Sequence, residues 1–114
     1  MSAARIAELN DLARTAMGVA SRLAMTSGIR ALSPADQSAI RERVETFNDF
    51  SKDNDPYGER DFGSFIYNPN ADICEKVFWK IDYYDKKDSD YGSEDPSDPS
   101  QTTRVLTIML AEEY

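Results

Sequence analysis

The stretch ICEKVFWKIDYY, residues 73–84, has the clearest pattern in the chain. In it, one set of residues alternates with another: Val77, Trp79, Ile81 and Tyr83 with Phe78, Lys80, Asp82 and Tyr84. A period of two is typical of a β-strand with one face buried and the other partly solvated. We therefore expect a strand over Ile73–Tyr84, and a sheet that contains it.

The segments on either side predict the partners of this strand. Asp61–Tyr67 has the composition of a second strand, and the turn formers of Asn68–Asp72 predict a hairpin between the two. Thr102–Ala111 is apolar on both faces, which favours a third strand in the middle of the sheet. Residues 85–101 are rich in acids and contain two prolines, a composition that predicts a long loop.

The first part of the chain predicts helices. Apolar residues recur at three- and four-residue spacing in Ser2–Met17, which indicates an amphipathic helix. Ser33 is a good N-cap for a second helix, which should end near Asn48–Phe50. Between them, Val19–Met25 fits either a helix or a strand, and we favour a short strand that ends before residues 26–28.

These elements predict an α+β fold, with two helices packed on a small, mainly antiparallel sheet of three to four strands. The chain has 114 residues, which suits a single domain over residues 1–114.

The composition argues against several classes of protein. There is no histidine, which removes the commonest general base and the usual zinc ligand. The lone cysteine, Cys74, cannot form an internal disulfide, so we expect a cytoplasmic protein and a packing role for this side chain. No apolar run has the length of a membrane span, and the first residues lack the pattern of a signal peptide.

The charge is concentrated in the second half. The chain has 13 Lys and Arg against 21 Asp and Glu, a net charge of −8. Residues 1–45 carry six bases and five acids, whereas residues 46–114 carry seven bases and 16 acids. Nucleic acid and anionic membranes are bound through basic surfaces, so neither is an expected partner.

The candidate site is the acidic region of residues 82–98, helped by residues 53–61. One interpretation is a solvated, mobile connection that keeps the protein soluble. The other is a surface that imitates a phosphate backbone and covers a basic cleft, with exposed tyrosine as an anchor. The candidate partner-binding residues are Asp82, Asp85, Asp88, Asp90, Tyr91, Glu94, Asp95, Asp98, Asp53, Asp55, Tyr57 and Glu59.

Other chemistry fits these acids less well. Residues 88–94 begin like a calcium loop but lack its twelve-residue spacing, so no metal or cofactor is expected. The acids of residues 53–61 read as solvated turn residues, because a catalytic carboxyl needs burial to raise its pKa. Of the aromatic residues, Tyr84 and Tyr91 border or enter the acidic loop, where we expect them to be exposed.

The chain resembles a small bacterial family described as a domain of unknown function. The resemblance covers about Ile6 to Tyr114. Its most specific strings are NDPYGERDFG at residues 54–63, FWKIDYYD at residues 78–85, YGSEDP at residues 91–96 and TRVLTIMLA at residues 103–111. One departure is Arg60, where members of the family often have histidine.

The resemblance implies an accessory or counter-defence role, since such families are carried by plasmids and other mobile elements. Together with the acidic half, it favours a non-enzymatic inhibitor of the anti-CRISPR or anti-restriction type, whose partner is a protein with a basic nucleic-acid-binding surface. Two alternatives stay open. One is a homodimeric or regulatory interaction module that uses an uncovered sheet face or edge; the other is a carboxylate-based enzyme.

Overall fold

The computed structural model describes residues 2–114 and contains, within them, three α-helices, one 3-10 helix and four strands. The helices are α1 (Ala3–Thr15), α2 (Ser27–Arg30), α3 (Pro34–Glu45) and the 3-10 helix η1 (Ala111–Glu113). The strands are β1 (Arg22–Met25), β2 (Phe62–Asn70), β3 (Ile73–Asp85) and β4 (Thr102–Leu110). They form one sheet in the order β1-β4-β3-β2.

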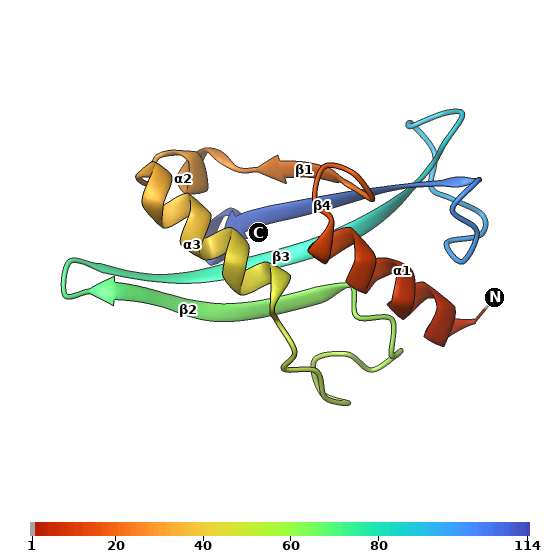
Figure 1. Ribbon diagram of the computed structural model, residues 1–114. Helices are drawn as coiled ribbons and strands as arrows, with labels where there is room; N and C mark the ends of the chain where they lie inside the picture. Colours follow the sequence, from red (N-terminus) through yellow and green to blue (C-terminus); the bar gives the residue numbers. More distant parts are fainter. Residues whose placement is uncertain (1) are drawn as a thin grey trace.

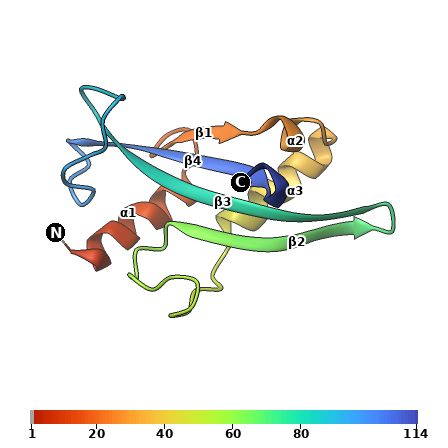
Figure 2. The same cartoon turned by 180° about the vertical axis from the view of Figure 1, so that it is seen from behind.

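The two faces of the sheet are covered to different extents. Helices α1 and α3 lie across one face (Figure 1), and on the opposite face, seen from behind, η1 lies at the end of β4 and against β3 (Figure 2). The pairs β2–β3 and β3–β4 are antiparallel, and β1–β4 is parallel. The predicted α+β class and the inner place of β4 are therefore confirmed.

The alternation along β3 has the predicted consequence. Val77 and Trp79 are fully buried under the helices, whereas Phe78 and Lys80 lie on the opposite face. Gly63 pairs with Trp79 across β2 and β3, and a Cβ on this glycine would lie 2.4 Å from the indole Nε1. The absence of a side chain at this position therefore gives the indole ring its place in the core.

Helix α3 begins as predicted and ends early. Ser33 accepts a hydrogen bond from the Asp36 amide, the expected N-cap. The helix stops at Glu45, short of the predicted end near Asn48–Phe50. Phe47 and Phe50 instead pack edge-on against the Trp79 ring, at 5.5 and 6.2 Å between centroids. This tertiary packing replaces the last helical turn that the sequence pattern indicated.

The short strand predicted before residues 26–28 is present as β1, and it is followed by a short helix, α2 at Ser27–Arg30, that was not predicted. The carboxylate of Glu113 accepts hydrogen bonds from the Thr26 hydroxyl at 2.6 Å and from the Gly28 amide at 2.9 Å. The hydrogen bond from Thr26, followed by those from the amides, lowers the pKa of Glu113. The acceptor for the Gly28 amide thus lies 85 positions further along the chain, so the sequence around α2 does not reveal it.

The hairpin is also longer than predicted. Strand β2 continues through Pro69 to Asn70, so the predicted turn of Asn68–Asp72 is too wide. Because β2 is an edge strand, the missing amide hydrogen of Pro69 costs little. The packing role expected of Cys74 is wrong too, since this thiol is exposed.

Candidate functional site

The acidic loop, residues 85–101, is fastened to the sheet along its length. The Asp85 amide donates to the Tyr91 carbonyl at 2.8 Å, and the Ser93 amide donates to the Tyr83 carbonyl at 3.1 Å. The Lys86 amide closes the base of the loop on the Gln101 carbonyl at 3.0 Å. These bonds divide the loop into two short lobes that meet at Gly92, which bridges to Tyr84.

Four of the predicted acids stabilise the loop through hydrogen bonds to its backbone. Each accepts a hydrogen bond from the backbone amide two residues further on, the geometry of an Asx turn. In Asp98 the carboxylate also accepts from the Ser100 hydroxyl at 2.7 Å and from Gln101 at 2.7 Å, which lowers its pKa. The four turns begin at Asp85, Asp88, Asp95 and Asp98.

The predicted acids of the loop differ in exposure. Asp88, Asp90 and Glu94 are exposed, whereas Asp85, Asp95 and Asp98 are partly buried by the turns they make. Tyr91 is 66% exposed at the tip, as predicted, and Tyr84 is half-buried in the sheet.

The second predicted segment is a compact turn between α3 and β2. The carboxylate of Asp55 accepts from the Arg60 amide at 3.1 Å, which fixes Arg60 in the left-handed region at φ 56°. The Arg60 guanidinium then pairs with Asp11 of α1 at 3.0 Å and lies over the Phe50 ring. Asp53 is exposed, and Tyr57 presents 81% of its surface to solvent.

A buried polar network joins the two predicted segments, and sequence reasoning missed it. The side-chain amide of Asn10, fully buried in α1, donates to the Glu59 carbonyl at 2.9 Å and to the Tyr83 hydroxyl at 2.8 Å. Its oxygen accepts from Nε of Arg104 at 2.7 Å. The Tyr83 hydroxyl donates in turn to the Glu59 carboxylate at 3.2 Å.

Arg104 connects this network to the acidic loop. Arg104 is 5% exposed, and its guanidinium donates to the Pro96 carbonyl and lies 5.1 Å from the centre of the Tyr83 ring. The sequence offered one signal of this network: Arg104 is a charged residue within the apolar run of β4. The network thus spans α1, β3, β4 and both predicted segments.

Burial shifts the pKa values of groups in and near the network, whereas we expected the acids of residues 53–61 to be solvated. Burial raises the pKa of Asp61, and the neighbouring charges of Glu59, Asp55 and Asp82 raise it further. Burial also raises the pKa of the Tyr83 hydroxyl and lowers that of the Arg104 guanidinium. The expectation that the acids of residues 53–61 are all solvated is therefore wrong for Asp61, which is half-buried.

The structure separates the predicted acids into groups. Asp82 lies on the open face of the sheet, where its carboxylate pairs with Lys80 at 3.0 Å. Helix α1 lies between the acidic loop and the turn of residues 51–60 in both views (Figures 1 and 2). The two segments therefore lie on opposite sides of α1, connected underneath by Asn10.

A groove of about 210 Å³, lined by both apolar and polar residues, borders the acidic loop. Leu12 of α1 is 51% exposed and Val19, in the turn after α1, is 90% exposed. Pro99 and Lys86 form the wall on the loop side. This surface therefore combines exposed carboxylates with adjacent apolar area.

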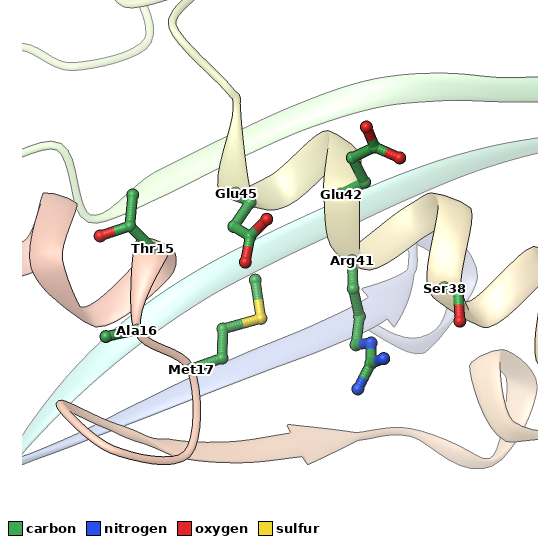
Figure 3. Close-up of a pocket in the computed structure, with 7 residues that line it drawn as sticks. All are labelled: Thr15, Ala16, Met17, Ser38, Arg41, Glu42 and Glu45. Atoms are coloured by element: carbon green, nitrogen blue, oxygen red, sulfur yellow. The ribbon is translucent and has the colours of Figure 1, made fainter.

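A larger hollow, of about 430 Å³, lies between the end of α1 and α3 (Figure 3). Met17 and Glu45 point toward each other across it, and Arg41 extends from α3 toward β1. None of the predicted site residues is among those that line it: Thr15, Ala16, Met17, Ser38, Arg41, Glu42 and Glu45.

Residues 25–113 match the family described as "Protein of unknown function (DUF3768)". The chain belongs to this family. The matched residues of the DUF3768 family include Glu59, Tyr83 and Arg104, whereas Asn10 lies outside them. Neither a curated protein nor a solved structure matches the chain.

Residues 2–114 contain no evident metal site: within this range, no three Cys, Asp or Glu side chains are grouped so that they would hold a metal ion. None of the helices in the same range has the length and apolarity to span a membrane.

Proposed function

We propose that this protein is a non-enzymatic inhibitor that covers the basic nucleic-acid-binding surface of a bacterial defence complex, of the restriction or CRISPR type. The observation that carries the proposal is the hydrogen-bonded order of the acidic loop. A mobile loop loses conformational entropy when it binds, whereas a loop fixed in advance avoids most of that cost. The Asx turns and the Arg104–Pro96 bond provide this order.

The charge supports the same proposal. The net charge of −8 attracts a basic partner at long range, and such attraction raises the association rate while weakening with salt. At the loop, the carboxylates of Asp88, Asp90 and Glu94 are exposed and lie within seven residues. They are the groups that we expect to take the place of nucleic-acid phosphates.

The surroundings of the loop favour a protein partner. The exposed ring of Tyr91 and the groove beside Leu12 and Val19 offer apolar area next to the carboxylates. Exposed tyrosine contributes contact area at a low cost in side-chain entropy. An interface of this kind combines salt-sensitive attraction with an apolar contact that salt does not weaken.

The test is a charge reversal with a matched control. Asp88→Asn, Asp90→Lys and Glu94→Lys together change the net charge from −8 to −3; the asparagine keeps a side-chain oxygen for the turn at residue 88, and Asp85, Asp95 and Asp98 stay unchanged. The control makes the same change in charge elsewhere, through three exposed acids: Glu42→Lys, Glu45→Lys and Asp72→Asn.

The measurement is inhibition of DNA binding and cleavage by purified restriction and CRISPR complexes, at low and high salt. We expect the wild type and the control to inhibit one of them at low salt, and the loop variant to lose that inhibition. Full inhibition by the loop variant would contradict mimicry by the loop. Loss of inhibition in both variants would show that net charge alone matters, and would also contradict it.

A further inference from the structure

A basic hollow lies at the end of the sheet that carries the acidic loop. It measures about 290 Å³ and is lined by residues 18–22, by Lys86 and by residues 102–104. Its charged residues are Arg22, Lys86 and Arg104, and none of the described residues that line it is an acid. The chain as a whole has 21 acids and 13 bases, so the hollow has the opposite sign of charge to the molecule around it. An anion is therefore attracted to this place.

The sheet topology brings the bases of the hollow together from distant parts of the chain. Because β1 and β4 are parallel, both begin at this end of the sheet, and Arg22 pairs with Val105. Strand β3 runs the other way and ends here, so Lys86 follows it directly, and its amide donates to the Gln101 carbonyl. Gly18, at φ 81°, allows the turn that leads from α1 into β1. Figure 1 shows this turn beside the start of β4.

The cationic groups of the hollow lack acidic partners. Within residues 2–114, none of its bases forms an ion pair with a carboxylate. The ammonium of Lys86 donates to the Pro99 carbonyl at 3.2 Å, and Arg22 is exposed. Asp98, in the same loop as Pro99, has its carboxylate occupied by Ser100 and Gln101. The positive charge of the hollow is therefore available to a ligand.

Arg104 gives a bound anion a specific advantage. It is 5% exposed, and burial lowers the pKa of its guanidinium, because a charged group loses hydration in the fold. A buried charge is normally paired with one of opposite sign. Here Nε donates to Asn10 and Nη2 to the Pro96 carbonyl, both neutral, and no acceptor for Nη1 lies within residues 2–114. Because Arg104 lines the hollow, an anion bound there compensates part of this charge.

The arrangement of the bases favours a phosphate group over a carboxylate. A planar carboxylate is matched by the fork of one arginine, whereas a tetrahedral phosphate presents oxygens and a larger negative charge in several directions. Bases that come from three separate strand ends suit the second shape, and Thr103 adds a hydroxyl to the same lining. We propose that the basic hollow binds a phosphate group.

The phosphate group has two possible sources, and the neighbouring groove distinguishes them. The basic hollow adjoins the groove beside Leu12, because the two share lining residues: Val19, Ala20, Lys86, Thr102 and Arg104. Free phosphate needs only the basic hollow, whereas a small phosphomonoester can place its organic part along the groove. Inorganic phosphate and phenyl phosphate are the two probes that separate these sources.

The test is a titration of the full chain followed by amide NMR, with sodium chloride added to keep the ionic strength constant. Inorganic phosphate should shift the amide signals of residues 18–22, 86 and 102–104, with a dissociation constant on the order of 1 mM. If phenyl phosphate binds more tightly and also shifts the Leu12 signal, the source is an organic phosphate. Equal or weaker binding of phenyl phosphate identifies free phosphate.

Two variants and a matched control test the bases themselves. Arg22→Gln and Lys86→Gln each remove one exposed base and should weaken phosphate binding about tenfold. Lys87→Gln makes the same change in net charge at a neighbouring exposed position that does not line the hollow, and should bind phosphate like the wild type. Circular dichroism checks that each variant folds, as expected for substitutions at exposed positions.

Three results would overturn the proposal. The first is the absence of shifts at these residues up to about 10 mM phosphate, or the same shifts with chloride alone. The second is acetate binding as tightly as phosphate. The third is wild-type affinity in both Arg22→Gln and Lys86→Gln. Because the hollow contains none of the exposed acids of the loop, failure here is distinguishable from failure of the inhibitor function.

Discussion

Asn10→Ala tests whether the buried network organises the candidate site. The substitution removes three hydrogen bonds of a fully buried side chain: those to the Glu59 carbonyl, the Tyr83 hydroxyl and the Arg104 guanidinium. Two neutral bonds contribute about 1 kcal/mol each, and the bond to the charged arginine about 1.5–3 kcal/mol. The expected loss in the free energy of unfolding is therefore about 3–5 kcal/mol, a large share of the about 5–15 kcal/mol typical of a domain.

The assay is equilibrium unfolding in urea at neutral pH. Asn48→Ala removes an exposed asparagine and should change the free energy of unfolding by less than about 0.5 kcal/mol. Arg104→Met is measured alone and with Asn10→Ala. Because the two residues share one network, the double variant should lose less than the sum of the single losses, by about 0.5–3 kcal/mol.

The network also makes a prediction about the loop. Because Arg104 holds the Pro96 carbonyl, its release in the Asn10→Ala variant should speed amide hydrogen exchange in residues 93–101 more than in β2. A loss below about 1 kcal/mol, or strict additivity with Arg104→Met, would refute the view that these residues act as one buried unit.

Two acids should affect stability in opposite directions as pH changes. The pKa of Glu113 is lowered in the fold, mainly by the Thr26 hydroxyl, so its stabilising effect is present above its ordinary pKa of 4.5 and is lost as pH falls through the lower folded value. Glu113→Gln should therefore lower the melting temperature at pH 7 and have little effect at the acid end, as measured by thermal unfolding from pH 2 to pH 7. The pKa of Asp61 is raised, mainly by burial, so stability is lost as pH rises from its ordinary pKa of 3.8 through the folded value. Asp61→Asn should raise the melting temperature at pH 7 but not below the ordinary pKa, and a drop at pH 7 would contradict burial as the dominant cause.

The sequence alone determined the elements whose pattern is local. The alternation of residues 73–84 predicted β3, and the N-cap at Ser33 predicted the start of α3. The apolar run of β4 predicted its place inside the sheet, since side chains that are apolar on both faces favour a strand covered on both sides. The acids of the loop and their net charge are likewise properties of composition.

Tertiary structure decided the features that depend on distant partners. Helix α2 begins where the Gly28 amide donates to Glu113, and α3 stops where Phe47 and Phe50 reach Trp79. The candidate site shows the same division. Its acids were visible in the sequence, whereas their order depends on Asn10 and Arg104, which are 94 positions apart. A buried hydrogen bond forms only when folding has brought both partners out of water, and no local pattern records which two residues will meet.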